Sequence, residues 1–114
     1  MQRADVPSAL LADVETRLGI TWSDPATDER VRGWIASGTE YIDRRAGEVQ
    51  DYDRDGAART LMMEYVRYAR DEALDVFENN YLGLIVALQT DAEVTRYVEK
   101  AIQANGGADL AGVQ

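Results

Sequence analysis

The sequence predicts an all-α fold, a small bundle of four to five helices with one long central helix. Apolar residues recur at three- and four-residue spacing along most of the chain, which is the period of amphipathic helices. The segments with this period are separated by stretches rich in glycine, proline or aspartate, which begin and end helices. A chain of 114 residues without an internal repeat has room for one domain with one modest core.

The first two helices are expected over residues 8–18 and 28–46, with a proline-containing loop between them. Ser8 is a residue type that caps helices, and Gly19 stands at the usual C-terminal glycine position. The second helix has acidic residues in its first turn and two arginines in its last, as the helix dipole favours, and Gly47 should end it. Its broad apolar face is formed by Val31, Trp34, Ile35, Tyr41 and Ile42.

The third helix is predicted to start after an aspartate-rich turn and to run to about Asn79 as the long central helix, because no proline or interior glycine interrupts it. The apolar run YLGLIVALQ at 81–89 fits a buried helix or a strand, and helix is favoured because no partner strand is evident. Asp91 is expected to cap a last amphipathic helix that Gly106 and Gly107 end. The apolar residues of that helix are Val94, Tyr97, Val98 and Ile102.

The expected organisation is one helical domain over residues 1–105 and a flexible C-terminal tail over 106–114. No apolar run is long enough to span a membrane, and the first residues lack the apolar stretch of a signal peptide. We therefore expect the protein in the cytoplasm or in a particle assembled there, without a membrane partner.

The amino-acid composition disfavours most kinds of catalytic and metal-binding site. The chain has no histidine and no cysteine, which excludes imidazole bases, cysteine nucleophiles, thiolate zinc sites and disulfides. Its one lysine, Lys100, lies in a polar helical stretch where a depressed pKa is not expected. We expect no enzyme, no catalytic residues and no cofactor. A formal net charge of -9 also opposes tight binding of nucleic acid.

Residues 51–56 read DYDRDG, which is how an EF-hand calcium loop begins. The ninth and twelfth positions of that loop would be Arg59 and Met62, so the closing oxygen ligands are missing. We therefore predict no metal site. The preferred interpretation is a polar turn whose last aspartates cap the next helix. A cation-binding role for the Asp51–Gly56 turn is kept as the alternative, within a small non-enzymatic binding or regulatory module.

Three carboxylates, Asp71, Asp75 and Glu78, would fall on one face of the predicted third helix. Their mutual repulsion, and their place near the helix C-terminus, would destabilise that helix. They are either a solvated face or an acidic surface that meets a partner or lines a passage. A two-metal site is disfavoured, because di-iron bundles use histidine beside glutamate.

Four residues are candidates for contacts with other polypeptides. The stretch YVRYAR at 65–70 interleaves tyrosine with arginine, and both residue types are common anchors of protein interfaces. Consecutive helix positions face different ways, so Arg67, Tyr68 and Arg70 cannot all lie in the core. Trp22, in the loop before the second helix, is either a lid over the core or an exposed anchor.

With these residues in view, the sequence resembles the head-tail connector, or adaptor, family of long-tailed phages and prophages. Three stretches carry the resemblance: GITWSDPATDERV at 19–31, WIASGTEYIDRRAG at 34–47, and the segment from DYDRDG through YVRYARDEALDVFENNYLGLIVALQ at 51–89. The resemblance covers about residues 8–90, and the segment from Thr90 onward matches no pattern of the family.

The resemblance implies a non-enzymatic head-completion protein at the head-tail junction of the virion, present in the host cytoplasm during assembly. Copies would form a ring of about twelve beneath the portal protein, extend the DNA channel, and dock a downstream neck or tail-completion protein. DNA would pass without tight binding, since an acidic wall repels it. On this interpretation Trp22, Arg67, Tyr68 and Arg70 are candidates for subunit or portal contacts, and the three carboxylates are candidates for the channel lining.

Overall fold

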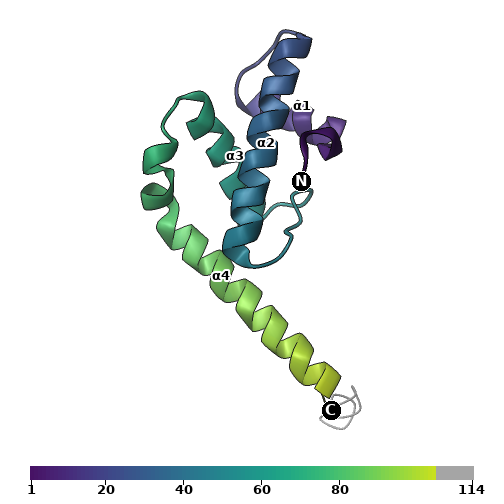
Figure 1. Cartoon of the computed structure of the whole chain (residues 1–114), viewed down its shortest axis with the longest axis vertical. Coiled ribbons are helices and arrows are strands. Elements are labelled where there is room, and N and C mark those ends of the chain that lie inside the picture. Colours follow the sequence, from purple (N-terminus) through teal and green to yellow (C-terminus); the bar gives the residue numbers. More distant parts are fainter. Residues whose placement is uncertain (105–114) are drawn as a thin grey trace.

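The fold is all-helical over the part of the chain that the computed structural model describes, residues 1–104. No strand occurs among these residues, and the helices form a small bundle, which confirms the predicted fold class (Figure 1). The predicted tail at 106–114 lies outside the described residues. The elements are a 3-10 turn η1 (Arg3–Asp5) and helices α1 (Ser8–Arg17), α2 (Pro25–Ala46), α3 (Ala57–Arg70) and α4 (Leu74–Ala104).

Helix α1 ends where its glycine predicts. Gly19 has a φ of 76°, which glycine adopts without steric cost. The N–H of Ile20 donates to the carbonyl of Glu15 at 2.9 Å, and the N–H of Gly19 donates to that of Thr16 at 3.1 Å. These two bonds form a Schellman cap. The other end differs from expectation, because Ser8 is the first helical residue and no side chain caps the helix.

Helix α2 begins at Pro25, ahead of the predicted Asp28. Asp24 is its cap: one carboxylate oxygen accepts from the N–H of Ala26 at 3.3 Å, and the other accepts from the hydroxyl of Thr27 at 2.8 Å. The hydrogen bond from Thr27 lowers the pKa of Asp24. Proline is favoured at the first helical position because its fixed φ suits a helix and its missing N–H costs nothing there. The residue predicted to lie in the loop therefore starts the helix.

The centre of the bundle is α2, which packs against η1, α1, α3 and α4. Gly38 allows α3 to approach closely, because a Cβ at this position would lie 2.8 Å from the ring of Tyr65. The predicted long central helix is therefore wrong in its position: α2 is central, and the longest helix is α4. The largest fully buried side chains are Val14, Val31, Ile35, Thr39, Ile42, Leu61, Met62, Val66, Phe77 and Ile85.

An aromatic cluster joins α2, α3 and the start of α4. Phe77 is 2% exposed, and its ring meets those of Tyr41, Tyr65 and Tyr68 edge-on, with centroids 5.4 to 6.0 Å apart. Tyr81 lies against the same ring at 5.1 Å. Edge-to-face pairs at these distances add stability beyond the buried area. This cluster holds the first turns of α4 against the bundle.

The predicted third helix is two helices, because the chain turns between α3 and α4. Glu72 has a φ of 55°, in the left-handed region. The N–H of Ala73 donates to the carbonyl of Tyr68 at 2.8 Å, and the N–H of Glu72 donates to that of Ala69 at 3.2 Å. This is the same Schellman arrangement that ends α1, with a glutamate in the position where glycine is usual.

Helix α4 runs from Leu74 to Ala104 with a kink at Tyr81, where φ is -116° and ψ is 15°. The boundary predicted at Asn79 and Asn80 is thus a kink rather than an end. The prediction that Asp91 caps a separate helix is wrong, since α4 continues through it. No glycine or proline lies between 84 and 104 to break the helix.

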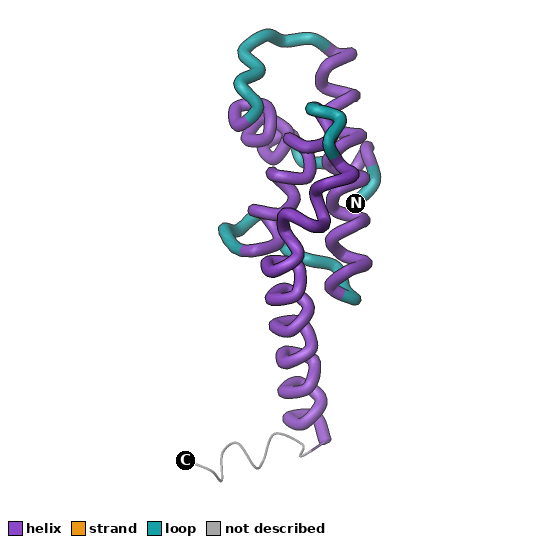
Figure 2. The backbone as a smooth tube through the Cα atoms, turned by 90° about the vertical axis from the view of Figure 1, so that its left-hand side faces the viewer, coloured by secondary structure: helices purple, strands orange, loops and turns teal. Residues whose placement is uncertain are grey.

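The second half of α4 projects from the bundle. Ala92 is its last buried residue, and residues 93–104 are here called the arm. Figures 1 and 2 show the arm extending past the other helices, with none beside it in either view. The molecule measures 58 × 29 × 21 Å, with a radius of gyration of 17.4 Å. A compact domain of this length would have about 13 Å.

Candidate interaction surface

The arm exposes apolar side chains along its length. The exposed fractions are 56% for Val94, 76% for Tyr97, 48% for Val98 and 36% for Ile102. Val86, at 48%, continues this surface toward the bundle. A polar helix face would be favoured on a helix that meets only water. The apolar residues of the predicted last helix are therefore the ones that solvent reaches.

Polar contacts fix the base of the arm to the C-terminus of α2. Arg96 donates to the carbonyl of Ala46 at 3.3 Å and lies 3.6 Å from the carboxylate of Glu48. Two turns earlier, the amide of Gln89 donates to the carbonyl of Arg45 at 3.0 Å. A cation near the carbonyl end of a helix is favoured by the helix dipole. The arm therefore leaves the bundle in a defined direction.

Two of the predicted interface residues, Arg67 and Tyr68, take part in contacts within the chain. Arg67 donates to Glu64 at 2.9 Å and lies over the ring of Tyr68 at 5.3 Å. Tyr68 is half-buried in the aromatic cluster, and its hydroxyl accepts from the amide of Asn80 at 3.1 Å. About half of the Arg67 side chain stays exposed, so it can still reach a partner.

Glu64 joins three helices, although it was not among the residues predicted from the sequence to have a role. Its carboxylate accepts from Arg67 of α3 and from the hydroxyl of Tyr81 of α4 at 2.9 Å, and it lies 3.7 Å from Arg17 of α1. Burial alone would raise the pKa of Glu64, but the hydrogen bonds from Arg67 and Tyr81 lower it below its usual value. Nothing in the local sequence distinguishes this glutamate from a surface one, because its partners come from distant segments.

The other two predicted interface residues differ in exposure. Arg70 donates to the carbonyl of Leu18 at 2.9 Å, at the end of α1, and to Asp71 at 3.1 Å. Trp22 is 58% exposed in the loop between α1 and α2, where its indole N–H donates to Thr27 at 3.4 Å. Of the two interpretations of Trp22, the exposed side chain agrees with the anchor and not with the lid.

The three carboxylates predicted to share one helix face lie on two elements. Asp71 is the C-terminal cap residue of α3, and Asp75 lies in the first turn of α4, where the dipole favours negative charge. Glu78 accepts from the hydroxyl of Tyr41 at 3.0 Å and forms an ion pair with Arg45. The expected destabilisation of a single helix is therefore wrong. Asp75 is exposed on the surface.

The aspartate turn is organised around a tyrosine. Tyr52 is 4% exposed, and its hydroxyl donates to the carboxylate of Asp43 at 2.6 Å and contacts the carbonyl oxygen of Thr39 at 3.2 Å. Burial raises the pKa of Tyr52. Asp51 accepts from the N–H of Asp53 at 2.9 Å. The prediction that the last aspartates cap α3 is wrong, since Gly56 is the cap residue and no side chain bonds to that end.

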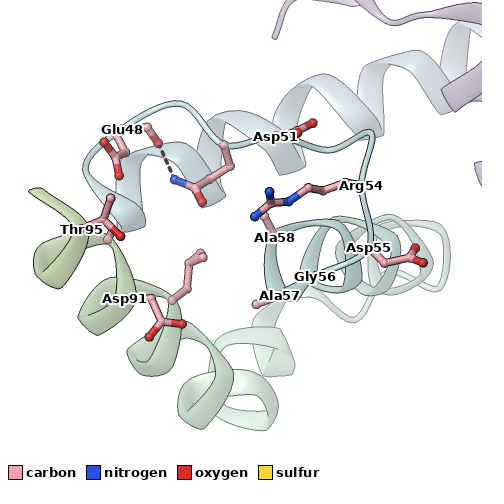
Figure 3. Close-up of a pocket in the computed structure, with 12 residues that line it drawn as sticks. Glu48, Asp51, Arg54, Asp55, Gly56, Ala57, Ala58, Asp91 and Thr95 are labelled. Atoms are coloured by element: carbon pink, nitrogen blue, oxygen red, sulfur yellow. Dashed lines mark hydrogen bonds between the residues drawn. The ribbon is translucent and has the colours of Figure 1, made fainter. Parts of the chain in front are cut away.

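A pocket of about 250 Å³ lies beside this turn, between the α2–α3 loop, the start of α3, and α4. Figure 3 shows Arg54 extending over it, while the carboxylates of Asp51 and Asp55 point in different directions. Arg59, at the ninth EF-hand position, donates to the carbonyl of Tyr52 at 2.7 Å. Within residues 1–104, no three metal-ligating side chains are grouped to hold an ion.

Along the described helices, no stretch combines the length and the apolar character that crossing a membrane requires. Comparison with protein-family models, with curated proteins and with solved structures finds no match for this chain. Membership of the connector family therefore stays a prediction from the sequence.

Proposed function

We propose that this protein is a structural head-tail connector of a tailed phage or prophage. In this role it forms a ring of about twelve copies beneath the portal protein, extends the DNA channel, and docks a neck or tail component. It works at the head-tail junction of the virion after assembly in the host cytoplasm. The proposal assigns it no catalysis and no cofactor.

The proposal rests on the family resemblance of residues 8–90, and the observation of the structure that supports it is the exposed apolar surface of the projecting arm. Exposed apolar side chains in a contiguous patch are typical of sites where another polypeptide binds. The pocket beside the aspartate turn is lined by charged residues of both signs rather than by a contiguous apolar surface. Recognition of polypeptides by a helical bundle is what a connector requires.

Two other surfaces support the proposal in detail. Trp22 and the free part of Arg67 supply an aromatic and a cationic anchor, which are the residue types most often found at the energetic centres of interfaces. Asp71 and Asp75 keep carboxylates exposed near the α3–α4 turn, where they suit an acidic channel wall. In this proposal Tyr68, Arg70 and Glu78 support these surfaces from within the chain.

The test is assembly with a portal protein from the phage or prophage genome that would encode this chain. Size-exclusion chromatography with light scattering should show this chain bound to portal rings, with about twelve copies per ring. The variant Trp22→Ala should weaken this binding, and Val49→Ala is the matched control, because Val49 is a still more exposed apolar residue on another loop. A chain that never joins portal rings would contradict the proposal.

Calcium titration separates this proposal from the cation-binding alternative. Calorimetry with calcium should give no binding heat at micromolar concentrations, because the ninth and twelfth positions of the EF-hand pattern are Arg59 and Met62. Micromolar binding that Asp51→Asn and Asp53→Asn abolish would favour the regulatory module instead.

A further inference from the structure

The arm and the turn before it carry a heptad pattern on their exposed side. The residues at 3-4-3-4-3 spacing are here called the seam: Ala87, Thr90, Val94, Tyr97, Ala101 and Ala104. Spacing that averages 3.5 residues lets two helices wrap around each other in a coiled coil, with the repeated residues facing the partner.

The seam points away from the bundle. At 100° per residue, Ile85, Leu88 and Ala92 share one side of α4, and all three are buried against the bundle. The seam residues share the opposite side, where Val94 and Tyr97 are more than half exposed. A second helix can therefore lie along the seam without meeting the bundle that carries it.

We propose that the partner of the seam is the seam of a second copy of this chain, running antiparallel. In an antiparallel coiled coil the first apolar position of one heptad faces the second apolar position of the other helix. Val94 then packs against Tyr97 of the second copy, Thr90 against Ala101, and Ala87 against Ala104. Each bulky Tyr97 meets a smaller valine, and every seam residue has a partner.

Charge on the flanks of the seam favours this orientation. The antiparallel register places Glu93 of each copy beside Lys100 of the other, which gives two symmetric ion pairs from the only lysine in the chain. A parallel pair would instead place Glu93 beside Val98, leaving both charges without a partner. The antiparallel pair also keeps the two acidic bundles at opposite ends, which limits repulsion between chains of net charge -9.

The pairing goes beyond the proposed ring and does not depend on it. A two-fold contact of this kind closes on itself and gives a dimer, whereas a ring needs contacts between different surfaces of neighbouring copies. We therefore expect the dimer when the chain is free in solution, outside a ring. Because the seam is short and contains small side chains, the dissociation constant should be on the order of 100 µM, as expected for a small transient interface.

Sedimentation equilibrium with charge-swapped variants tests the proposal. The wild type should pass from monomer to dimer as its concentration rises through the expected dissociation constant. Glu93→Lys and Lys100→Glu should each raise that constant about tenfold, because two attractive pairs become repulsive. The double variant Glu93→Lys/Lys100→Glu restores both pairs and the wild-type net charge, so it should return the constant to within about twofold of the wild type.

The matched control is Glu99→Lys, which makes the same charge change on the arm but lies off the seam flanks. It should leave dimerisation unchanged or strengthen it slightly, because it reduces net repulsion. All of these positions are exposed, so circular dichroism should report an unchanged fold. A wild type that remains monomeric at millimolar concentration, a control that weakens pairing as much as Glu93→Lys, or a double variant without rescue would each overturn the proposal.

Cysteine cross-linking tests the orientation independently. The chain has no cysteine, so disulfides can form only where they are introduced. An oxidised mixture of Val94→Cys and Tyr97→Cys chains should yield mainly mixed dimers, because these two positions face each other only in the antiparallel register. Cross-linking of each variant mainly with itself would indicate a parallel pair and overturn the proposal.

Discussion

The two halves of α4 have a similar pattern of apolar residues, but an apolar face is buried in the first half and exposed in the second. In the first half, Phe77, Ile85 and Leu88 are buried against the bundle. In the second half, Val94, Tyr97 and Val98 recur at a similar helical spacing, yet all three are exposed. The difference arises because α2 ends at Ala46, so no neighbouring helix among residues 1–104 covers the second half of α4. An apolar stripe thus predicts a buried face, but the length of the neighbouring helix decides where burial stops.

The largest expected effect lies in the first half. Phe77→Ala removes the ring on which four tyrosines pack, and should lower the free energy of unfolding by about 3–5 kcal/mol, because it leaves a cavity in the centre of the aromatic cluster. Urea denaturation followed by circular dichroism measures the change. A loss below about 1 kcal/mol would mean that the first turns of α4 are not held by this cluster.

The next effect concerns the glutamate that joins α4 to the other helices. Glu64→Gln should cost about 1–2 kcal/mol at neutral pH, because a hydrogen-bonded and mostly buried carboxylate loses its charge. Since the folded-state pKa of Glu64 is lowered, its contribution is present above the unfolded value of 4.5 and is lost as the pH falls through the folded value. The difference between wild type and variant should therefore shrink in acid.

The control for this change is Glu40→Gln. Glu40 pairs with Arg44 one turn away at 2.7 Å, but both side chains are mostly exposed. Such surface pairs contribute less than about 0.5 kcal/mol. If both variants lose equal stability, the network around Glu64 does not join the helices as described.

A smaller effect of opposite sign is expected at the turn that starts α4. Glu72 has a left-handed backbone conformation without the freedom of glycine, so Glu72→Gly should stabilise the fold by about 0.5–1 kcal/mol. The reciprocal change is Gly19→Ala, which should destabilise by about 1 kcal/mol because Gly19 holds the same position after α1. Thermal melts of both variants test the pair. A destabilising Glu72→Gly would contradict the left-handed turn.

The ends of α1, α2 and α3 show which helix boundaries could be predicted from the sequence. Gly19 and Gly47 mark their helix ends, so those boundaries were predicted correctly. The end of α3 was not predicted, because glutamate is a common helix-forming residue and Glu72 gives no sign of a helix end. The cap becomes visible only in the structure, where the N–H groups of Glu72 and Ala73 donate to carbonyls of the preceding turn. The local sequence identifies a helix end where a glycine follows the helix. It fails where an ordinary residue adopts an unusual backbone.

The candidate surfaces were less predictable than the fold. Exposure of Trp22 agrees with one of its two interpretations, because a loop aromatic has few neighbours to cover it. Tyr68 and Glu78 were predicted to contact partners or a channel, and in the structure they also contact Asn80 of α4 and Arg45 of α2 within the chain. The contacts of a side chain depend on tertiary packing, which the spacing along one helix does not contain.

The smallest expected effect lies at the far end of α4 and is the sharpest comparison with Phe77→Ala. Tyr97→Ala makes a similar truncation in the same helix, yet Tyr97 is 76% exposed and should contribute less than about 0.5 kcal/mol to the stability of the monomer. The melt should be recorded well below the dissociation constant of the proposed dimer, so that pairing does not contribute. A loss comparable to that of Phe77→Ala would mean that the arm packs against the bundle. An unchanged melt together with weaker dimerisation at high concentration would assign the Tyr97 side chain to contacts between molecules, because the same truncation would then act on association and leave folding untouched.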